Sequence, residues 1–305
     1  MWGKEPISII TDQDLGIGVA ISKVFPRTRH RLCLWHIKKK FPEKLSHIYH
    51  KNSAFKRVLK RYIRESPSVE KFEEDWNNLI LTYGLEKNEW LQGLYDIRKS
   101  WIPVYNRNTF FARMNTTQRS ESINAFFDSF VNSRTTLQGF VTKFAKAVDS
   151  HYEKERKEDF DSRHKSPSLR ISSKIEHQAA STYTRTIFGM FQKELVSSNY
   201  FTKEKIEKNG TLYKYKIMSS YDQNDAFTVS LSLESKTCEC ECQLFEFKGI
   251  VCRHMLSIFQ VKNILEIPSH YILQCWTKEA NKGVKNDECR SSTENEHHMS
   301  GALPC

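Results

Sequence analysis

The chain has 305 residues, of which 39% are hydrophobic and 27% charged, a balance that excludes an intrinsically disordered protein. No apolar run approaches the roughly 18 to 20 residues needed to span a bilayer, and the first residues carry no secretory signal pattern. We therefore expect an intracellular protein of one large domain or two ordinary ones.

The chain is strongly basic, with a formal net charge of +11 and an isoelectric point near 9.2. Most of the excess lies in residues 1–60, which hold 13 Lys and Arg residues against 4 Asp and Glu residues. This bias favours an anionic partner, and nucleic acid is the expected one for a protein without membrane signals. The stretch from Lys23 to Lys60 is the predicted DNA-contacting surface. Basic surfaces also occur on proteins that bind no nucleic acid, so a role without DNA stays open.

The beginning of the chain predicts a β-α-β unit. Residues 7–11 are a short apolar run typical of a buried strand, and residues 15–25 carry apolar side chains at helical spacing up to Pro26. Residues 30–37 alternate well enough to form a second strand. Asp12 would then follow the first strand directly, at the carboxyl end where open α/β sheets place functional groups.

From there to about residue 200 the sequence predicts almost only helices, whose apolar stripes are expected to form a core. The predicted helices are 53–65, 68–83, 87–99, 119–132, 136–163 and 173–197. After a turn at 208–210, alternating runs at 212–218 and 226–233 predict a small hairpin, and an apolar helix is expected at 253–262. The polar end of the chain is expected to be disordered. The predicted fold class is therefore α+β and mostly helical.

A cysteine and histidine cluster, CECECQLFEFKGIVCRH at residues 238–254, predicts a structural zinc site. The residues expected to hold zinc are Cys240, Cys242, Cys252 and His254. The first two share one side of an extended strand, and the last two begin a helix after a turn that Gly249 permits. Three sulfurs and one nitrogen leave no open position for water, as in structural zinc sites. Cys238 lies on the same strand face and is an alternative to either cysteine of the first pair. Ordinary reduced cysteines beside a core histidine are the structural alternative.

Two other groups of polar residues could carry chemistry. Asp12 and Glu121 could hold divalent metal for phosphoryl transfer if a third carboxylate joined them. As helix caps or first-turn acids they would serve structure alone. His30, Cys33 and His36 form a third group, but on the predicted strand the cysteine faces away from both histidines. Buried structural histidines are therefore the expected reading there.

Three long segments are similar to parts of a known family. They read IITDQDLGIGVAISKVFPRTRHRLCLWHIKKKFPEKL (9–45), WIPVYNRNTFFARMNTTQRSESINAFFDSFV (101–131) and CECQLFEFKGIVCRHMLSIF (240–259). Together they resemble the Mutator-like transposase domain and the SWIM zinc finger of the plant far-red-impaired-response family of transcription regulators. The resemblance covers roughly residues 5–280.

The resemblance implies roles for the residues named above. The SWIM pattern of the family falls on Cys240, Cys242, Cys252 and His254, which leaves Cys238 as the extra cysteine. In related transposases an RNase H-like core uses an Asp-Asp-Glu triad, in which Asp12 resembles the second acid and Glu121 the third. The first acid and three early strands would lie upstream of this chain. We therefore expect a partial, N-terminally truncated RNase H-like domain without transposase activity.

The sequence thus predicts a zinc-binding nuclear protein that regulates DNA-templated transcription, derived from a Mutator-like transposase and catalytically inactive. Its expected partners are DNA and other family members, as homo- or hetero-oligomers, with no membrane and no small-molecule substrate. The alternative is a module without DNA contact that dimerises with full-length relatives. The expected divisions are a partial transposase-derived domain at 1–200, a SWIM-type zinc finger region at 208–265 and a disordered tail at 280–305.

Overall fold

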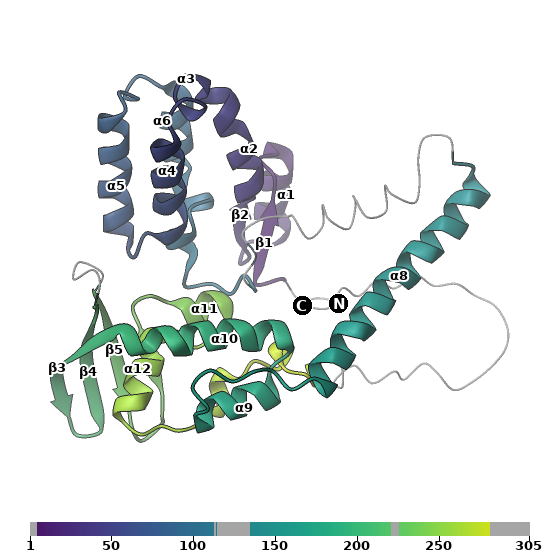
Figure 1. Ribbon diagram of the computed structural model, residues 1–305. Coiled ribbons are helices and arrows are strands. Elements are labelled where there is room, and N and C mark those ends of the chain that lie inside the picture. The colour runs from purple at the N-terminus through teal and green to yellow at the C-terminus, as the bar shows by residue number, and fades with distance from the viewer. Residues whose placement is uncertain (1–4, 113, 115–134, 221–225, 281–305) are drawn as a thin grey trace.

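The chain folds around two separate hydrophobic clusters, one in the earlier and one in the later part of its sequence. Figure 1 shows the corresponding parts of the ribbon, coloured purple to blue and teal to yellow. The computed structural model describes residues 5–112, 114, 135–220 and 226–280. The first cluster is built between Leu34 and Ile102, and the second between Ala112 and Trp276. We call these two parts the N-terminal body and the C-terminal body. The mostly helical α+β class predicted from the sequence is confirmed.

The predicted β-α-β unit opens the N-terminal body. Strand β1 (Ser8–Thr11) pairs in parallel with β2 (Arg29–Leu32), and helix α1 (Leu15–Val24) connects them. Asp14 caps this helix, because its carboxylate accepts a hydrogen bond from the backbone N–H of Ile17 at 2.8 Å. Asp12 lies one residue after β1, as predicted, and its side chain is exposed.

The strand predicted at 30–37 is wrong in its second half. β2 ends at Leu32, and helix α2 (Leu34–Lys44) begins two residues later. The buried side chains of this helix recur at helical spacing: Leu34, Ile37 and Phe41. Over eight residues the same apolar positions also fit an alternating pattern, so the sequence alone could not separate the two periods.

Short helices and turns complete the N-terminal body. They are α3 (Ser46–Tyr49), α4 (Ser53–Glu65), α5 (Val69–Thr82), α6 (Glu89–Asp96) and the 3-10 turns η1 (Arg98–Ser100) and η2 (Pro103–Asn106). The predicted helices at 53–65, 68–83 and 87–99 are confirmed, the last with its end in a 3-10 turn. Its core combines aliphatic with aromatic side chains, and the fully buried aromatic ones include Phe55, Phe72 and Trp101.

Three helices lead into the C-terminal body. α8 (Leu137–His164) confirms the helix predicted at 136–163, whereas the helix predicted at 173–197 is two helices, α9 (Lys174–Thr182) and α10 (Arg185–Ser197). The break falls at Tyr183, which pairs with Thr277 in an isolated bridge. This long-range pairing overrides the local helix propensity. The helix predicted at 119–132 lies outside the described residues.

A four-stranded antiparallel sheet forms the second half of the C-terminal body. Its strands, in spatial order, are β3 (Phe201–Asn209), β4 (Leu212–Ser219), β5 (Ala226–Ser232) and β6 (Cys238–Cys240). The sequence predicted the two middle strands. It missed β3 because KEKIEK carries charges where a strand signal needs apolar alternation.

Short elements surround this sheet. The 3-10 turn η3 (Ser198–Tyr200) precedes β3, helices α11 (Leu244–Lys248) and α12 (Arg253–Val261) follow β6, and the 3-10 turns η4 (Ser269–Tyr271) and η5 (Gln274–Trp276) close the body. Helix α12 was predicted. Residues of α9 and α10 belong to the same cluster as the sheet. The division of the chain at 1–200, 208–265 and 280–305 stays a prediction, and 281–305 lies outside the described residues. In the described ranges no helix is long and apolar enough to cross a membrane.

The two bodies meet where Phe111 follows the last 3-10 turn of the N-terminal body. Its backbone N–H donates to the carbonyl of Phe247 at 3.2 Å. The guanidinium of Arg31 lies over both rings, 4.7 Å from the centroid of Phe111 and 5.5 Å from that of Phe247. Burial, followed by repulsion from Arg29, lowers the pKa of Arg31 to about 10. The two aromatic rings attract the buried guanidinium of Arg31 through cation–π contacts. They therefore reduce the cost of burying its charge compared with aliphatic neighbours.

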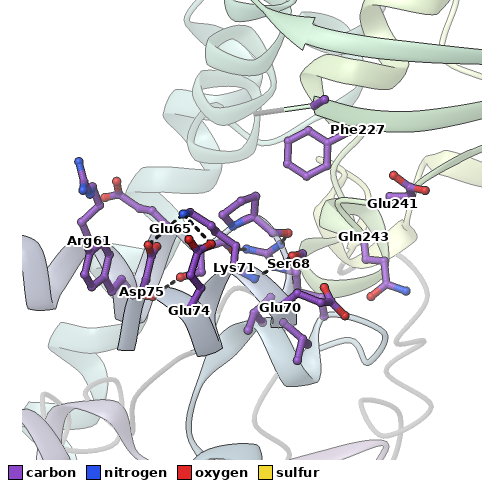
Figure 2. A pocket seen from close by; sticks show the side chains of 17 residues that line it. Arg61, Glu65, Ser68, Glu70, Lys71, Glu74, Asp75, Phe227, Glu241 and Gln243 are labelled. Atoms are coloured by element: carbon purple, nitrogen blue, oxygen red, sulfur yellow. Dashed lines mark hydrogen bonds and ion pairs between the residues drawn. The ribbon is translucent and has the colours of Figure 1, made fainter. Parts of the chain in front are cut away.

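A groove with a volume of about 1320 Å³ lies between the two bodies (Figure 2). One wall is the α4–α5 connection, and the other includes Phe227 of β5 and Glu241 of the turn after β6. On the helical wall, Lys71 forms ion pairs with Glu74 at 3.0 Å and with Asp75 at 3.2 Å, as Figure 2 shows. Its charge is thus balanced by its own helix.

Candidate metal centre

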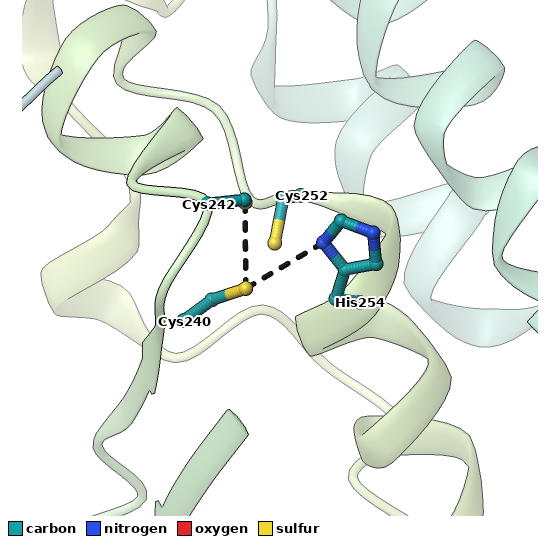
Figure 3. Close-up of side chains that lie close together, drawn as sticks. All are labelled: Cys240, Cys242, Cys252 and His254. Carbon is teal, nitrogen blue, oxygen red and sulfur yellow. Dashed lines mark hydrogen bonds between the residues drawn. The ribbon is translucent and has the colours of Figure 1, made fainter. Parts of the chain in front are cut away.

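Four buried side chains from two neighbouring elements converge beside the sheet (Figure 3). Cys240 ends β6, and Cys242 lies two residues further, in the following turn. Cys252 is the N-cap of α12, and His254 lies in the first turn of that helix. Within the described residues these four form the one group of three or more potential ligands. The structure thus brings together the four residues predicted from the sequence.

The distances between the ligand atoms fit a small cation. All four atoms lie within 4.8 Å of one another. The Sγ atoms of Cys240 and Cys242 are 3.3 Å apart, and Cys240 Sγ lies 3.5 Å from Nδ1 of His254. Ligands bound tetrahedrally to zinc at about 2.0 to 2.3 Å are separated by roughly 3.3 to 3.8 Å. The donor set and its spacing are therefore those of a closed Cys3His site.

The three thiols perturb one another's protonation. Hydrogen bonds with Cys240 first, and then with Cys252, lower the pKa of Cys242. The hydrogen bond with Cys242 raises the pKa of Cys240, and burial raises the pKa of Cys252. A buried group of thiols that resists carrying more than one negative charge is stabilised by a divalent cation, which offsets two of the three thiolate charges.

Aromatic rings fix the orientation of the histidine. The His254 ring stacks on Phe227 of β5 with a centroid distance of 4.3 Å, and it meets Phe201 of β3 edge-on at 5.0 Å. These contacts leave Nδ1 directed at Cys240 (Figure 3). The ring orientation that a metal ligand needs is thus set by packing against the sheet.

A forked ion pair fixes the start of α12. The guanidinium of Arg253 donates to both carboxylate oxygens of Glu194 on α10, at 2.9 and 2.8 Å. The backbone N–H of Arg253 donates to the same carboxylate at 3.0 Å. Because Arg253 lies between Cys252 and His254, this pair holds both candidate ligands against α10.

The turn between the two pairs of ligands depends on Gly249, as predicted. This residue ends α11 in the left-handed region, with φ of +69°. A Cβ atom there would lie 2.4 Å from Leu273 Cδ1 and 2.6 Å from Trp276 Nε1. The tight approach lets Trp276 donate from Nε1 to the carbonyl of Lys248 at 3.0 Å. Glycine is therefore required both for the backbone angle and for the space.

Cys238 is buried on the same strand but is not part of the four-residue group. Its backbone N–H donates to the hydroxyl of Tyr271 at 2.6 Å, and its carbonyl accepts from that hydroxyl at 2.8 Å. Burial raises the pKa of its thiol to about 12, which disfavours a thiolate. The role of Tyr271 was missed from the sequence, because it comes from more than thirty residues further along the chain.

Among the described residues, the other candidate ligands do not converge into a further site. Asp12 belongs to no cluster of three potential ligands among the described residues, and Glu121 lies outside them. The strand arrangement predicted for His30, Cys33 and His36 is wrong, because only the first lies on β2. Nε2 of His30 is 2.7 Å from the hydroxyl of Thr11, and burial lowers the pKa of this histidine. Cys33 is fully buried at the start of α2.

The solvent side of α4 carries a concentration of cations. Its buried residues are Phe55, Leu59 and Ile63, which leaves five Lys and Arg residues and one Glu elsewhere on SAFKRVLKRYIRE. Lys38 of α2 approaches this face. Burial, followed by repulsion from Arg64 and Lys60, lowers its pKa to about 8. Three cations that repel one another in this way favour a bound anion.

Comparison with known proteins agrees with the geometry of the metal centre. The MULE transposase domain matches residues 1–40, and the SWIM zinc finger matches residues 227–263, a range that contains all four converging side chains. The structure and these matches together define a transposase-derived protein with a SWIM zinc finger. No solved structure is similar to the chain.

Three proteins of Arabidopsis thaliana place the chain more closely. FAR1-RELATED SEQUENCE 5 is 43% identical over 94% of this chain and 36% of its own length. FAR-RED IMPAIRED RESPONSE 1 is 38% identical over 93% of this chain and 34% of its own length, and FAR1-RELATED SEQUENCE 9 is 38% identical over 92% and 51%. The chain belongs to the FAR1-related family. It spans between about a third and a half of the length of these relatives.

Proposed function

We propose that this chain is a zinc-binding nuclear protein that regulates transcription through DNA. The observation that carries the proposal is the buried Cys3His group inside the SWIM match of a FAR1-related chain. Bound zinc would supply fixed structure rather than reactivity, since four protein ligands leave no position for a substrate. The ligands would come from two elements. β6 and the turn after it provide Cys240 and Cys242, and the start of α12 provides Cys252 and His254.

The zinc assignment is tested by metal content. Purified protein is expected to hold about one zinc per chain, to lose it in Cys252→Ala and to keep it in Cys238→Ala. The second variant is a matched control, because it removes a buried thiol from the same core without touching the four-residue group. Equal zinc loss in both variants would contradict the proposed ligand set, and wild-type protein without zinc would contradict the site itself.

The DNA-contacting surface is proposed to be the basic stretch from Lys23 to Lys60, extended along α4 to Arg64. Among the described residues, Lys38, Lys60 and Arg64 form no ion pair with a carboxylate. Burial lowers the pKa of Lys38 most, and a phosphate between the three cations would offset the repulsion that lowers it further. The electrostatic part of DNA binding is then expected to come from this face.

Salt dependence tests this surface. Lys60→Gln with Arg64→Gln should weaken binding to duplex DNA and reduce the slope of log K against log salt concentration by roughly 2. Lys143→Gln with Lys146→Gln is the control, since it removes two charges from exposed positions of α8. Binding that is insensitive to salt, or equal losses in the two double variants, would remove α4 from the DNA surface.

Catalytic inactivity is part of the proposal. Among the described residues Asp12 belongs to no group of potential metal ligands, and Glu121 lies outside them. Magnesium-dependent strand transfer requires several carboxylates around the metal ions. Strand-transfer product formed above the level of an Asp12→Asn control would overturn this part alone.

One observation favours the second candidate, an interaction module that dimerises with full-length relatives without contacting DNA. Helix α8 extends away from both bodies in Figure 1, and it exposes Leu137, Phe140 and Val141, of which the first is 81% exposed. Exposed apolar side chains on one long helix can mark a protein contact. Co-purification with a full-length relative, together with no DNA retardation at low salt, would favour this candidate.

A further inference from the structure

The hairpin of β3 and β4 is unusually rich in lysine. The two strands contain five lysines and two glutamates, in FTKEKIEKN and LYKYKIMS. β3 is the edge strand of the sheet, and its residues from Glu204 to Asn209 are exposed. Lysine on an edge strand discourages pairing with other chains wherever it points. A more specific role would require that the lysines be sorted onto one face.

The register of the hairpin places three of the five lysines together on one face. Lys203 pairs with Ile217, Lys205 with Tyr215 and Lys208 with Tyr213. Directly paired residues of antiparallel strands lie on the same face of the sheet. Since Tyr215 and Ile217 are buried in the core, these three lysines lie on the face that α12 covers further along the sheet.

The two glutamates of β3 lie on the opposite face. Glu204 pairs with Lys216 and Glu207 with Lys214, so each acid has a lysine directly across the hairpin. Charges on that face are therefore balanced, whereas the face with Lys203, Lys205 and Lys208 receives no acid from either strand. The hairpin therefore places both of its glutamates on one face and lysines alone on the other.

A β-bulge is responsible for this separation. The register shifts between Lys205 and Glu207, which leaves Ile206 as the extra residue. In a regular strand, Glu207 would share a face with Lys205, and Lys208 would lie on the other side. The bulge exchanges them, and it therefore brings Lys208 to the basic face and removes Glu207 from it.

A fourth lysine from another element completes the surface. Lys262 directly follows α12, and its Nζ lies 3.4 Å from the ring centroid of Tyr213 and 5.7 Å from that of Tyr215. The Nζ of Lys208 lies over Tyr213 as well, at 5.6 Å. We call Lys203, Lys205, Lys208 and Lys262 the lysine face. Within the part of the chain that the structure describes, none of the four forms an ion pair with a carboxylate.

We propose that the lysine face binds the phosphate backbone of duplex DNA. The inference rests on the proposed DNA-binding function and adds a second contact, in the C-terminal body, to the one on α4. Lysine side chains act as point charges that suit phosphates without selecting a sequence. An acidic protein segment would be expected to use an apolar anchor, and the tyrosines of this face are covered by Lys262 and Lys208. The contact is therefore sequence-independent.

The hairpin offers its own matched control for a test. Lys205→Gln with Lys208→Gln removes two charges from the lysine face, and Lys214→Gln with Lys216→Gln removes two from the opposite face of the same strands. All four side chains are exposed, so both variants are expected to fold, which their zinc content would verify. The probe is a mixed-sequence duplex of roughly 30 base pairs, about three helical turns. Affinity is measured over a range of salt concentrations.

The first variant is expected to bind more weakly and to reduce the salt slope by roughly 2, and the second is expected to match wild type. Equal losses in both variants would overturn the proposal, because the face would then be irrelevant. Unchanged binding in both would overturn it while leaving the DNA function intact. Wild-type protein that binds no duplex would overturn both proposals. Displacement of DNA by poly-glutamate of equal charge, at equal concentration, would assign the face to acidic protein and also overturn it.

Discussion

The N-terminal and C-terminal bodies are stabilised in different ways. The N-terminal body buries large aromatic and aliphatic side chains, and its polar groups serve one another, as where Glu73 accepts from Arg98, Tyr95 and Tyr105. The C-terminal body also has an apolar core, but it closes with a three-residue strand and a five-residue helix around the Cys3His group. Elements this short contribute little by themselves. From this difference we expect the first body to depend on packing alone and the second on packing together with the proposed metal.

Chelation of zinc should separate the two bodies most strongly. Zinc sites of this kind contribute on the order of 10 kcal/mol of apparent free energy to small folded units. Hydrogen exchange measured after chelation is expected to show lost protection across residues 226–261 and retained protection across 53–82. Equal loss in both ranges would show that the bodies unfold together, and no loss would show that the finger does not need its metal.

A core truncation should have the opposite selectivity. Phe72 is fully buried between the rings of Trp76 and Tyr105, with centroid distances of 5.7 and 5.9 Å. Phe72→Ala is therefore expected to destabilise the N-terminal body by about 3 to 5 kcal/mol. Urea unfolding followed by tryptophan emission measures this loss, and zinc content should stay at the wild-type level. Loss of zinc in this variant would contradict the independence of the two bodies.

Two glycines with positive φ in the C-terminal body, Gly249 and Gly210, allow the effect of a close approach to be separated from the effect of the backbone angle. Gly249→Ala is expected to cost about 2 to 5 kcal/mol, because a left-handed alanine costs about 1 to 2 and the clash with Leu273 and Trp276 adds about 1 to 3. Gly210→Ala shares the positive φ, at +56°, but meets nothing within 4 Å, so it should cost only about 1 to 2. Thermal unfolding of both zinc-loaded variants measures the difference. Equal costs would mean that the close approach at Gly249 is relaxed in solution.

Local patterns in the sequence carried much of the fold and the whole proposed ligand set. Helical spacing predicted α4, α5 and α8, and the spacing of Cys240, Cys242, Cys252 and His254 predicted a group that the structure does bring together. These features depend on residues that are close in sequence. Zinc occupancy of the group stays a prediction.

The missed features all depend on distant partners or on competing periods. The break at Tyr183 is set by its pairing with Thr277, and the position of Cys238 is set by Tyr271. β3 has no apolar alternation, because its exposed end lies at the edge of the sheet. The second half of the strand predicted at 30–37 failed for another reason, since its apolar residues fit both periods. None of these four features could therefore be predicted from the local sequence alone.

The two ends of helix α12 lie at two different features of the C-terminal body, the Cys3His group and the lysine face. It begins beside Cys252 and His254, and Lys262 follows its last residue. Nine residues of helix measure about 13.5 Å, so a single short helix connects the candidate metal ligands to Lys262 of the lysine face. A displacement of the start of α12 would therefore be transmitted along the helix to Lys262 and its position over Tyr213.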